Sequence, residues 1–267
     1  MCFNGRVHLR MDTDLAAAYK SGAQRTRVIS EHWAGKNLYC PCCPSDSLES
    51  LPNNREAIDY ACSSCQSVFQ LKSCKATLGK RIVDGSFAAM SRAILAGSTP
   101  NLLTLRYDPF CWEVRELLLL PHFAFTLSCI EERVPLRVTA RRAGWVGCNI
   151  LLRNIPVDVR ICMVAGGKVV RPSEVRRKFR SMLPLKDIRP VQRGWTLDVL
   201  NIVRRIGKQQ FSLAEVYNYA GELENLHPDN RHVHDKIRQQ LQVLRDLGFL
   251  DFSGQGTYQF RTQPPHS

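Results

Sequence analysis

The 267-residue sequence lacks any apolar run near membrane length; its run of four leucines, Leu117–Leu120, ends at Pro121. Because a helix needs about 20 apolar residues to cross a bilayer, no membrane-spanning segment is expected. The first residues also lack the apolar centre of a secretory signal. With 44% hydrophobic and 23% charged residues, the composition is that of a globular protein. These features favour a cytoplasmic protein.

Acidic residues are few relative to basic ones, 24 against 37, which gives a formal net charge of +13. Between Arg133 and Arg193 there are fifteen basic residues and three acidic ones, Asp158, Glu174 and Asp187. Nearly all of the excess charge therefore lies in one stretch. A concentrated basic surface suits a polyanion, most often DNA or RNA. The alternative is a basic face that only keeps the protein in solution.

Cysteine, by contrast, is abundant, with eleven residues. An odd number in a reducing compartment argues against a disulfide framework. Cys40 with Cys43 and Cys62 with Cys65 form two CxxC pairs separated by 18 residues, the spacing of a zinc ribbon. Four thiolates leave no open position on the metal, so the expected zinc is structural. Cys42 could replace Cys43 through the rarer CxC spacing.

The second CxxC pair lies between two short segments of strand character, which predicts a hairpin with this turn at its tip. Asp59 then lies across from Gln70 and Lys72, alternate residues that project from one face. The Asp59 carboxylate, the Gln70 amide and the Leu71 carbonyl offer oxygen ligands for Mg²⁺. Lys72 can hold a water molecule and help to deprotonate it for attack on phosphorus. The pattern predicts metal-assisted phosphodiester hydrolysis; the alternative is a polar outer strand face.

The remaining pattern predicts an α+β fold with a mixed sheet. Strands are expected over residues 57–60, 67–72, 102–107, 114–120, 123–127, 157–164 and 168–170. Helices are expected over residues 15–29, 86–95 and 174–182, and the polar segment 45–55 is expected to be a loop. Residues 184–190 contain two prolines and are the best linker, which divides the chain into domains 1–189 and 190–267.

From Gly194 onward, three helices and a hairpin are expected, which is the winged-helix arrangement. The first helix is expected over residues 196–206. The second begins at a capping box formed by Ser212 and Glu215, and the third carries an apolar stripe from Val233 to Leu244. Polar residues on the third helix and in the wing suit base edges and phosphates: His232, Lys236, Arg238, Gln239, Gln240, Gln242, Ser253 and Gln255. Residues 191–267 carry nine basic and eight acidic residues, so a protein-binding winged helix is the alternative.

Three long stretches carry a family resemblance: TARRAGWVGCNI at 139–150, RGWTLDVLN at 193–201 and KIRQQLQVLRD at 236–246. With these stretches, the CxxC pairs and Leu71-Lys72 in corresponding order, the sequence resembles the DpnI family of methyl-directed restriction endonucleases. The resemblance implies a PD-(D/E)xK nuclease domain with an embedded four-cysteine zinc site, followed by a C-terminal winged helix. It also implies Mg²⁺ in catalysis and a double-stranded DNA substrate, GATC carrying N6-methyladenine, read by both domains.

The resemblance places the family's catalytic aspartate at Asp59 and its lysine at Lys72, but Gln70 stands where the family has glutamate. An amide oxygen can still bind Mg²⁺, although the site loses one negative charge and metal affinity should fall. DNA binding needs none of these residues. The alternative function is therefore a non-cleaving, methyl-DNA-binding protein or regulator.

Trp145 is expected near the methylated base. It follows Arg141 and Arg142 and lies between Gly144 and Gly147. An apolar ring can pack on an N6-methyl group, while the arginines bind phosphate or guanine. The alternative is a tryptophan of the hydrophobic core.

Overall fold

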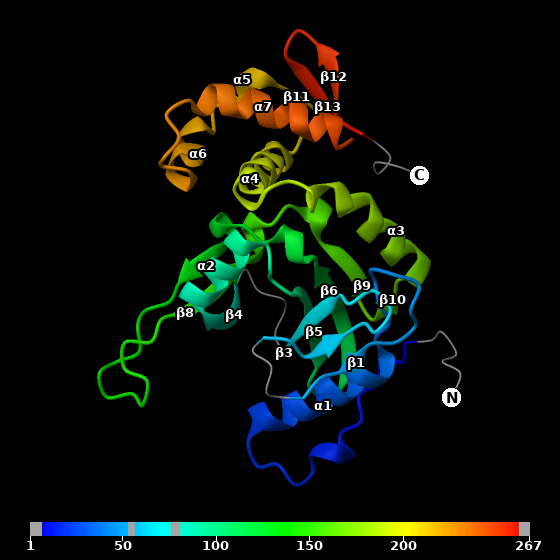
Figure 1. The fold of residues 1–267 in the computed structure, drawn as a ribbon. Coiled ribbons are helices and arrows are strands. Elements are labelled where there is room, and N and C mark those ends of the chain that lie inside the picture. The colour runs from blue at the N-terminus through cyan, green and yellow to red at the C-terminus, as the bar shows by residue number, and fades with distance from the viewer. Residues whose placement is uncertain (1–6, 53–56, 76–80, 262–267) are drawn as a thin grey trace. The chain divides into compact units, whose positions relative to one another are not determined.

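The computed structural model describes residues 7–52, 57–75 and 81–261. They belong to two compact units, each assembled from separate stretches of chain. The first unit is assigned residues 1–79, 100–122 and 160–180, and the second is assigned residues 80–99, 123–159 and 181–267. Figure 1 shows the elements of both units. The domain boundary predicted between residues 189 and 190 is not a boundary of these units, and it stays a prediction.

The first unit contains a seven-stranded mixed sheet in the order β1-β2-β3-β5-β6-β9-β10. β3 and β5 are parallel, and the other neighbouring pairs are antiparallel. The strands are β1 (Glu49–Ser50), β2 (Tyr60–Ala61), β3 (Val68–Cys74), β5 (Asn101–Asp108), β6 (Glu113–Leu120), β9 (Ile161–Ala165) and β10 (Lys168–Val169). The mixed sheet of the sequence analysis is thus confirmed. β1 lies within the segment predicted as a loop, of which residues 53–55 lie outside the described part of the chain.

Helix α1 (Gly22–Asn37) is fixed to this sheet by hydrogen bonds along its length. Thr26 shares one with the Tyr107 hydroxyl at 2.7 Å, Ser30 shares one with Ser73 at 3.0 Å, and the Tyr60 hydroxyl donates to the Glu31 carbonyl at 2.8 Å. The predicted helix over residues 15–29 was wrong in its bounds. That prediction followed a loose period of four through Leu15 and Tyr19, whose side chains are exposed.

The second unit contains a three-stranded antiparallel sheet in the order β4-β8-β7. Its strands are β4 (Arg81–Ser86), β7 (Ile130–Glu132) and β8 (Gly147–Leu151). Helix α2 (Phe87–Ala96) follows β4, with the Ser86 hydroxyl accepting from the Ala89 N–H and Gly97 ending the helix at φ 66°. The strand predicted at 123–127 was wrong. The segment instead forms two 3₁₀ turns, His122–Ala124 and Leu127–Cys129, with Phe123, Ala124 and Phe125 buried and Leu127 exposed.

The winged helix also belongs to the second unit. It consists of α4 (Pro190–Ile206), β11 (Gln210–Ser212), α5 (Leu213–Tyr217), α6 (Ala220–Leu226), α7 (Val233–Asp246), β12 (Leu250–Gly254) and β13 (Thr257–Phe260). The third helix, the capping box and the wing are confirmed. Three details differ from the prediction: β11 adds a third strand, the second helix is divided in two, and α4 begins at Pro190. Proline suits a first helical turn because its missing N–H would have no partner there.

Polar contacts join helix α4 to residues 128–158 of the same unit. Arg204 forms a bidentate ion pair with Asp158, and the Asn201 side chain donates to the Arg153 carbonyl at 3.0 Å. The Ser128 hydroxyl donates to the Asp198 carboxylate at 2.6 Å. These contacts explain why the winged helix and residues 123–159 form one compact unit.

Two further helices complete the described fold. α3 (Pro172–Met182) contains the helix expected over residues 174–182, and a short 3₁₀ turn, Leu183–Leu185, overlaps the predicted linker. The Gly166-Gly167 turn joins β9 to β10, which overlap the strands predicted at 157–164 and 168–170, although Val157–Val159 forms a 3₁₀ turn. None of the helices in the described ranges is long and apolar enough to cross a membrane.

Candidate metal centres and nucleic-acid interface

The hairpin that carries the candidate catalytic residues is formed by β2 and β3. Tyr60 pairs with Phe69 and Ala61 pairs with Val68 in an antiparallel register. Between the strands, the Cys62 N–H donates to the Ser67 carbonyl at 2.9 Å and closes the turn. The predicted hairpin with the second CxxC pair at its tip is therefore confirmed.

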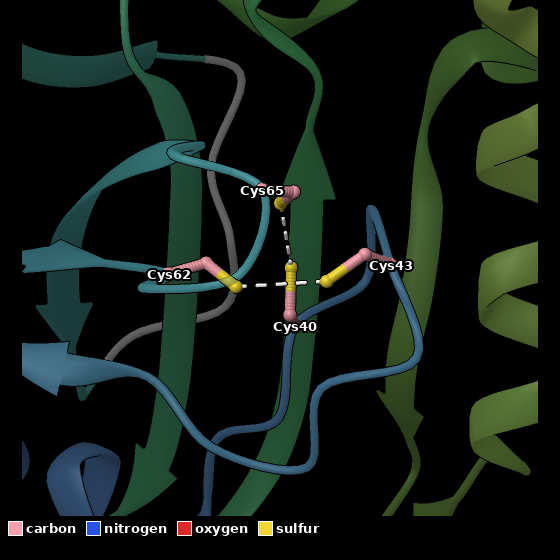
Figure 2. Close-up of side chains that lie close together, drawn as sticks. All are labelled: Cys40, Cys43, Cys62 and Cys65. Atoms are coloured by element: carbon pink, nitrogen blue, oxygen red, sulfur yellow. Dashed lines mark hydrogen bonds between the residues drawn. The ribbon is translucent and has the colours of Figure 1, made fainter.

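Four cysteine sulfur atoms lie together at this tip. The Sγ atoms of Cys40, Cys43, Cys62 and Cys65 all lie within 4.8 Å of one another. Cys40 and Cys65 are 3.6 Å apart, as are Cys43 and Cys62, and Figure 2 shows the four sulfur atoms pointing toward a common centre. A tetrahedral zinc with its usual bonds to sulfur places the sulfur atoms about 3.8 Å apart. The cluster thus has the size and chemistry of a structural zinc site.

The surroundings of the sulfur atoms distinguish Cys43 from Cys42. The Cys42 backbone N–H donates to the Cys40 sulfur at 3.4 Å, and the Cys42 sulfur is not part of the cluster. At Cys62, burial favours the thiol, but hydrogen bonds from the backbone N–H groups of Cys65 and Ser64 and from the side chains of Cys43 and Cys40 together outweigh it and lower the pKa to about 6. Cys62 thus favours the thiolate form that a metal requires, whereas burial raises the pKa of Cys65.

Arg176 of α3 forms hydrogen bonds with the turn that carries the first CxxC pair of this cluster. Its guanidinium donates to the Cys40 carbonyl at 3.0 Å and to the Ser45 carbonyl at 2.7 Å, and it pairs with Asp46 at 3.2 Å. It also lies over the Tyr39 ring at 5.2 Å. The sequence indicated a basic amphipathic helix here but gave no sign of this contact, which joins residues 136 positions apart.

Asp59 lies at the other end of the hairpin, where the strand pairing stops. Its N–H donates to the Phe69 carbonyl at 2.9 Å, and its carboxylate Oδ2 accepts the Leu71 N–H at 2.7 Å. The side chain therefore occupies the place that the next backbone carbonyl of a paired strand would take. One hydrogen bond thus fixes the carboxylate against the edge of β3.

The same register places Leu71, Gln70 and Lys72 around this end. In a paired strand, the N–H and C=O of one residue face the same neighbouring strand, so the Leu71 carbonyl faces the same edge as Asp59. Gln70 and Lys72 share the strand face opposite to Phe69. Gln70 is 9% exposed and Lys72 is half-buried. The hairpin thus brings the Asp59 carboxylate, the Leu71 carbonyl and the Gln70 strand position to one end.

Two hollows of the first unit adjoin this end of the hairpin. A small one of about 80 Å³ is lined by Asp59, Ser50 of β1, and Arg27 and Glu31 of α1. A larger one of about 860 Å³ lies between α1 and the ends of β3 and β5, and Arg27, Glu31 and Leu71 line it as well. Neither α1 residue was predicted, because the local pattern of the helix does not show that it lies beside Asp59.

Arg27 and Glu31 form an ion pair between these hollows, with the Arg27 Nε donating to the Glu31 carboxylate at 2.7 Å. This hydrogen bond and the charge of Glu31 raise the pKa of Arg27, and the charge of Asp59 adds to the effect. The Asp59 site is therefore flanked by a guanidinium as well as by a second carboxylate.

The outer face of α7 carries most of the predicted base-reading residues. His232, Arg238, Gln239 and Gln242 are exposed, Lys236 is half-buried, and Lys236 donates to Gln239 at 2.8 Å. In the wing, Ser253 and Gln255 are exposed, and Gln255 adopts a left-handed conformation at φ 49°. These side chains lie where the sequence analysis expected polar contacts.

Gln240 is a correction to that set. It is fully buried, and its side-chain oxygen accepts from the Thr196 hydroxyl of α4 at 2.7 Å. The apolar stripe of α7 follows Val233, Ile237 and Leu244, and position 240 lies on that stripe. Gln240 thus joins α7 to α4 and does not contribute to the outer face.

The long β7–β8 connection, residues 133–146, carries Arg141, Arg142 and Trp145. The Leu136 N–H donates to the Trp145 carbonyl at 3.0 Å, and Figure 1 shows the loop extending beyond the end of β8. Both arginines are exposed, and the Arg142 guanidinium lies 4.7 Å from the centre of the Trp145 ring. Trp145 is half-buried against Gly147, where an added Cβ would come within 2.9 Å of the ring.

Comparison with known families agrees with this arrangement of parts. The sequence model of the DpnI family, described as the Dam-replacing family, matches residues 7–188. The model of the Dam-replacing HTH domain matches residues 191–260. The first match covers the described sheet and both candidate metal sites, and the second covers the winged helix.

Proposed function

Because the chain belongs to the DpnI, or Dam-replacing, family, we propose that it is a methyl-directed type II endonuclease. Membership itself supports a methyl-dependent restriction endonuclease that binds DNA. The proposed substrate is double-stranded DNA in which the adenine of GATC carries an N6-methyl group, and the proposed place of action is the cytoplasm. The observation that supports cleavage most directly is the Asp59 carboxylate held at the open end of a hairpin whose tip carries the cysteine cluster.

The donor set at this end suits a hard divalent cation. Asp59, the Gln70 amide and the Leu71 carbonyl would hold Mg²⁺ through oxygen atoms. The bound ion would neutralise negative charge that develops on the phosphate and lower the pKa of water. Lys72, on the same strand face as Gln70, would orient the attacking water by hydrogen bonding. Direct attack of water on phosphorus needs no covalent enzyme intermediate.

Gln70 favours a second candidate function. A neutral amide leaves the site with one carboxylate among its three proposed ligands, which weakens the attraction for a divalent cation. DNA binding depends on other surfaces and would survive this change. A non-cleaving methyl-DNA-binding protein is therefore the alternative, and Gln70 is the residue that supports it.

Methyl recognition is proposed for two surfaces. The half-buried Trp145 ring offers an apolar face for the N6-methyl group, and Arg141 and Arg142 offer donors for phosphate or guanine. In the winged helix, the outer face of α7 would read base edges in the major groove while the wing contacts the backbone. The basic stretch around these arginines would supply the salt-dependent part of the affinity.

The deciding experiment is digestion of one plasmid prepared with and without N6-methyladenine at GATC, each in Mg²⁺, Mn²⁺ or EDTA. We expect double-strand cuts in the methylated plasmid with Mg²⁺ and none with EDTA. Binding of both plasmids without any cleavage in Mg²⁺ or Mn²⁺ would favour the alternative function.

Trp145→Ala tests methyl reading separately from affinity. We expect the preference for methylated over unmethylated duplex to be lost while binding to unmethylated duplex and the melting temperature change little. A fall of stability together with binding to both duplexes would instead mean that the ring is needed for folding.

A further inference from the structure

Two charged residues of α1, Arg27 and Glu31, line both hollows beside Asp59; Arg27 is the cation of this pair, and no sequence motif pointed to it. It shares the small hollow with Asp59 and the larger one with Leu71, the two residues proposed to hold the divalent cation. A phosphate bound at that cation must lie within reach of both residues. Arg27 therefore lines the same hollow as the carboxylate beside which a backbone phosphate would bind.

The position of Arg27 is fixed by its helix. Thr26 and Ser30, on either side of it in the sequence, share hydrogen bonds with Tyr107 of β5 and Ser73 of β3. Tyr60, the neighbour of Asp59, donates from its hydroxyl to the carbonyl of Glu31. The backbone that carries Arg27 is thus tied to the strands that carry the site. A side chain mounted in this way can hold a ligand at a defined place.

Glu31 holds one edge of the guanidinium. The Arg27 Nε donates to the Glu31 carboxylate at 2.7 Å, while the Arg27 side chain is 56% exposed. A guanidinium carries several N–H donors in one plane, so it can serve a carboxylate through one edge and a phosphate through another. The larger hollow is also lined by Arg25 and Lys75, which suits the charge of a nucleic-acid backbone.

From these contacts we infer that Arg27 binds a backbone phosphate of the DNA strand at the Asp59 site, and that Glu31 is the positioning residue that directs it. The inference rests on the proposed function and adds a substrate contact to it. An acidic residue beside a DNA-binding site then has a defined use, because it holds the arginine in place.

The test measures binding of the full-length protein to a short methylated GATC duplex in EDTA, over a range of salt concentrations. Arg27→Gln is expected to weaken binding about tenfold, to methylated and unmethylated duplexes alike, because one charged hydrogen bond is lost. The slope of log affinity against log salt should fall by about one, the value for one phosphate contact. Lys36→Gln is the matched control, since Lys36 is an exposed cation near the end of the same helix.

Variants of Glu31 test whether this residue positions the Arg27 side chain or only stabilises the fold. Glu31→Ala should weaken binding less than Arg27→Gln and leave the salt slope unchanged, and Glu31→Gln should restore most of the affinity because its amide oxygen still accepts from Arg27. An unchanged affinity and salt slope in Arg27→Gln, with a wild-type melting temperature, would overturn the inference. If the Asp59→Ala variant still cuts DNA, the proposed catalytic site is wrong. The binding assay with Arg27→Gln does not require cleavage, so the two proposals can fail separately. Arg27→Lys, which keeps the charge, should retain the salt slope if any Arg27 variant proves unstable.

Discussion

The two ends of the β2–β3 hairpin are built from the same short segment but present opposite chemistry. At the tip, four sulfur atoms within 4.8 Å of one another surround a closed centre. At the base, the Asp59 carboxylate lines a hollow of about 80 Å³, Leu71 lines one of about 860 Å³, and Gln70 lies on the other face of β3 from Leu71. A closed sulfur site stabilises structure, while an open oxygen site can admit water and a phosphate. The closed sulfur site at the tip therefore holds the two strands in the arrangement on which the oxygen site at the base depends.

Loss of the sulfur site should have the largest effect, because it removes the support from both ends. We expect Cys62→Ser to lose zinc, to lower the melting temperature by well over 10 °C, and to abolish both DNA binding and cleavage. Structural zinc contributes on the order of 10 kcal/mol to the folding of small zinc domains. Metal analysis and thermal melting measure the result.

Cys42→Ser is the matched control for that experiment, since its sulfur is outside the cluster. It should retain one zinc per chain and a wild-type melting temperature. Normal folding of the unmodified protein with far less than one zinc per chain would refute the assignment of the tip as a zinc site.

Changes at the base should affect chemistry and leave the tip intact. We expect Asp59→Ala and Lys72→Ala each to reduce cleavage at least about a hundredfold, a usual loss when one polarising group is removed. Zinc content and the affinity for methylated duplex should be unchanged, and Asp59→Ala should cost about 1 kcal/mol through the lost bond to the Leu71 N–H. Cleavage that survives both substitutions would show that the reacting groups lie elsewhere.

Gln70→Glu should sharpen the difference between the two ends by adding a negative charge to the oxygen site. We expect the Mg²⁺ concentration for half-maximal cleavage to fall about tenfold, because one added carboxylate attracts the cation more strongly. Gln70→Ala should raise that concentration instead. If Gln70→Glu cuts methylated GATC while the parent does not, the parent is a binding protein. If neither cuts but both bind, the catalytic assignment is wrong.

The smallest effect is expected from a change in the winged helix. Hydrogen bonds from Lys208 and from Ser212 lower the pKa of Glu215 to about 2 from its usual 4.5. Because the folded-state pKa is depressed, this carboxylate adds stability above about pH 4.5 and loses it as the pH falls toward 2. Glu215→Gln should flatten the acid dependence of stability in that window and leave zinc content and cleavage at neutral pH unchanged. Melting curves of both proteins from pH 2 to 7 provide the measurement.

The features that were predictable from the sequence are mostly local. The CxxC spacing led to the four sulfur atoms, and the alternation around Leu71 led to the placement of Asp59 across from Gln70. Gln240 was misplaced because a polar residue on an apolar stripe looks outward-facing until its partner Thr196 is known. Arg27, Glu31 and β11 were missed for the same reason: their partners are distant in the sequence, and a local pattern carries no record of them.

The route of the chain has a consequence for how the protein is made. Strand β6 pairs with β9, and Arg176 donates to the Cys40 carbonyl, so the first unit needs residues that follow much of the second. A ribosome releases the chain from its first residue onward, and domains tend to fold as they emerge. Here Cys40 precedes its arginine brace by 136 residues, and residues 121–160 separate β6 from its sheet neighbour β9. A chain truncated before β9 should therefore remain incompletely folded and susceptible to proteolysis, even though it contains every proposed metal ligand.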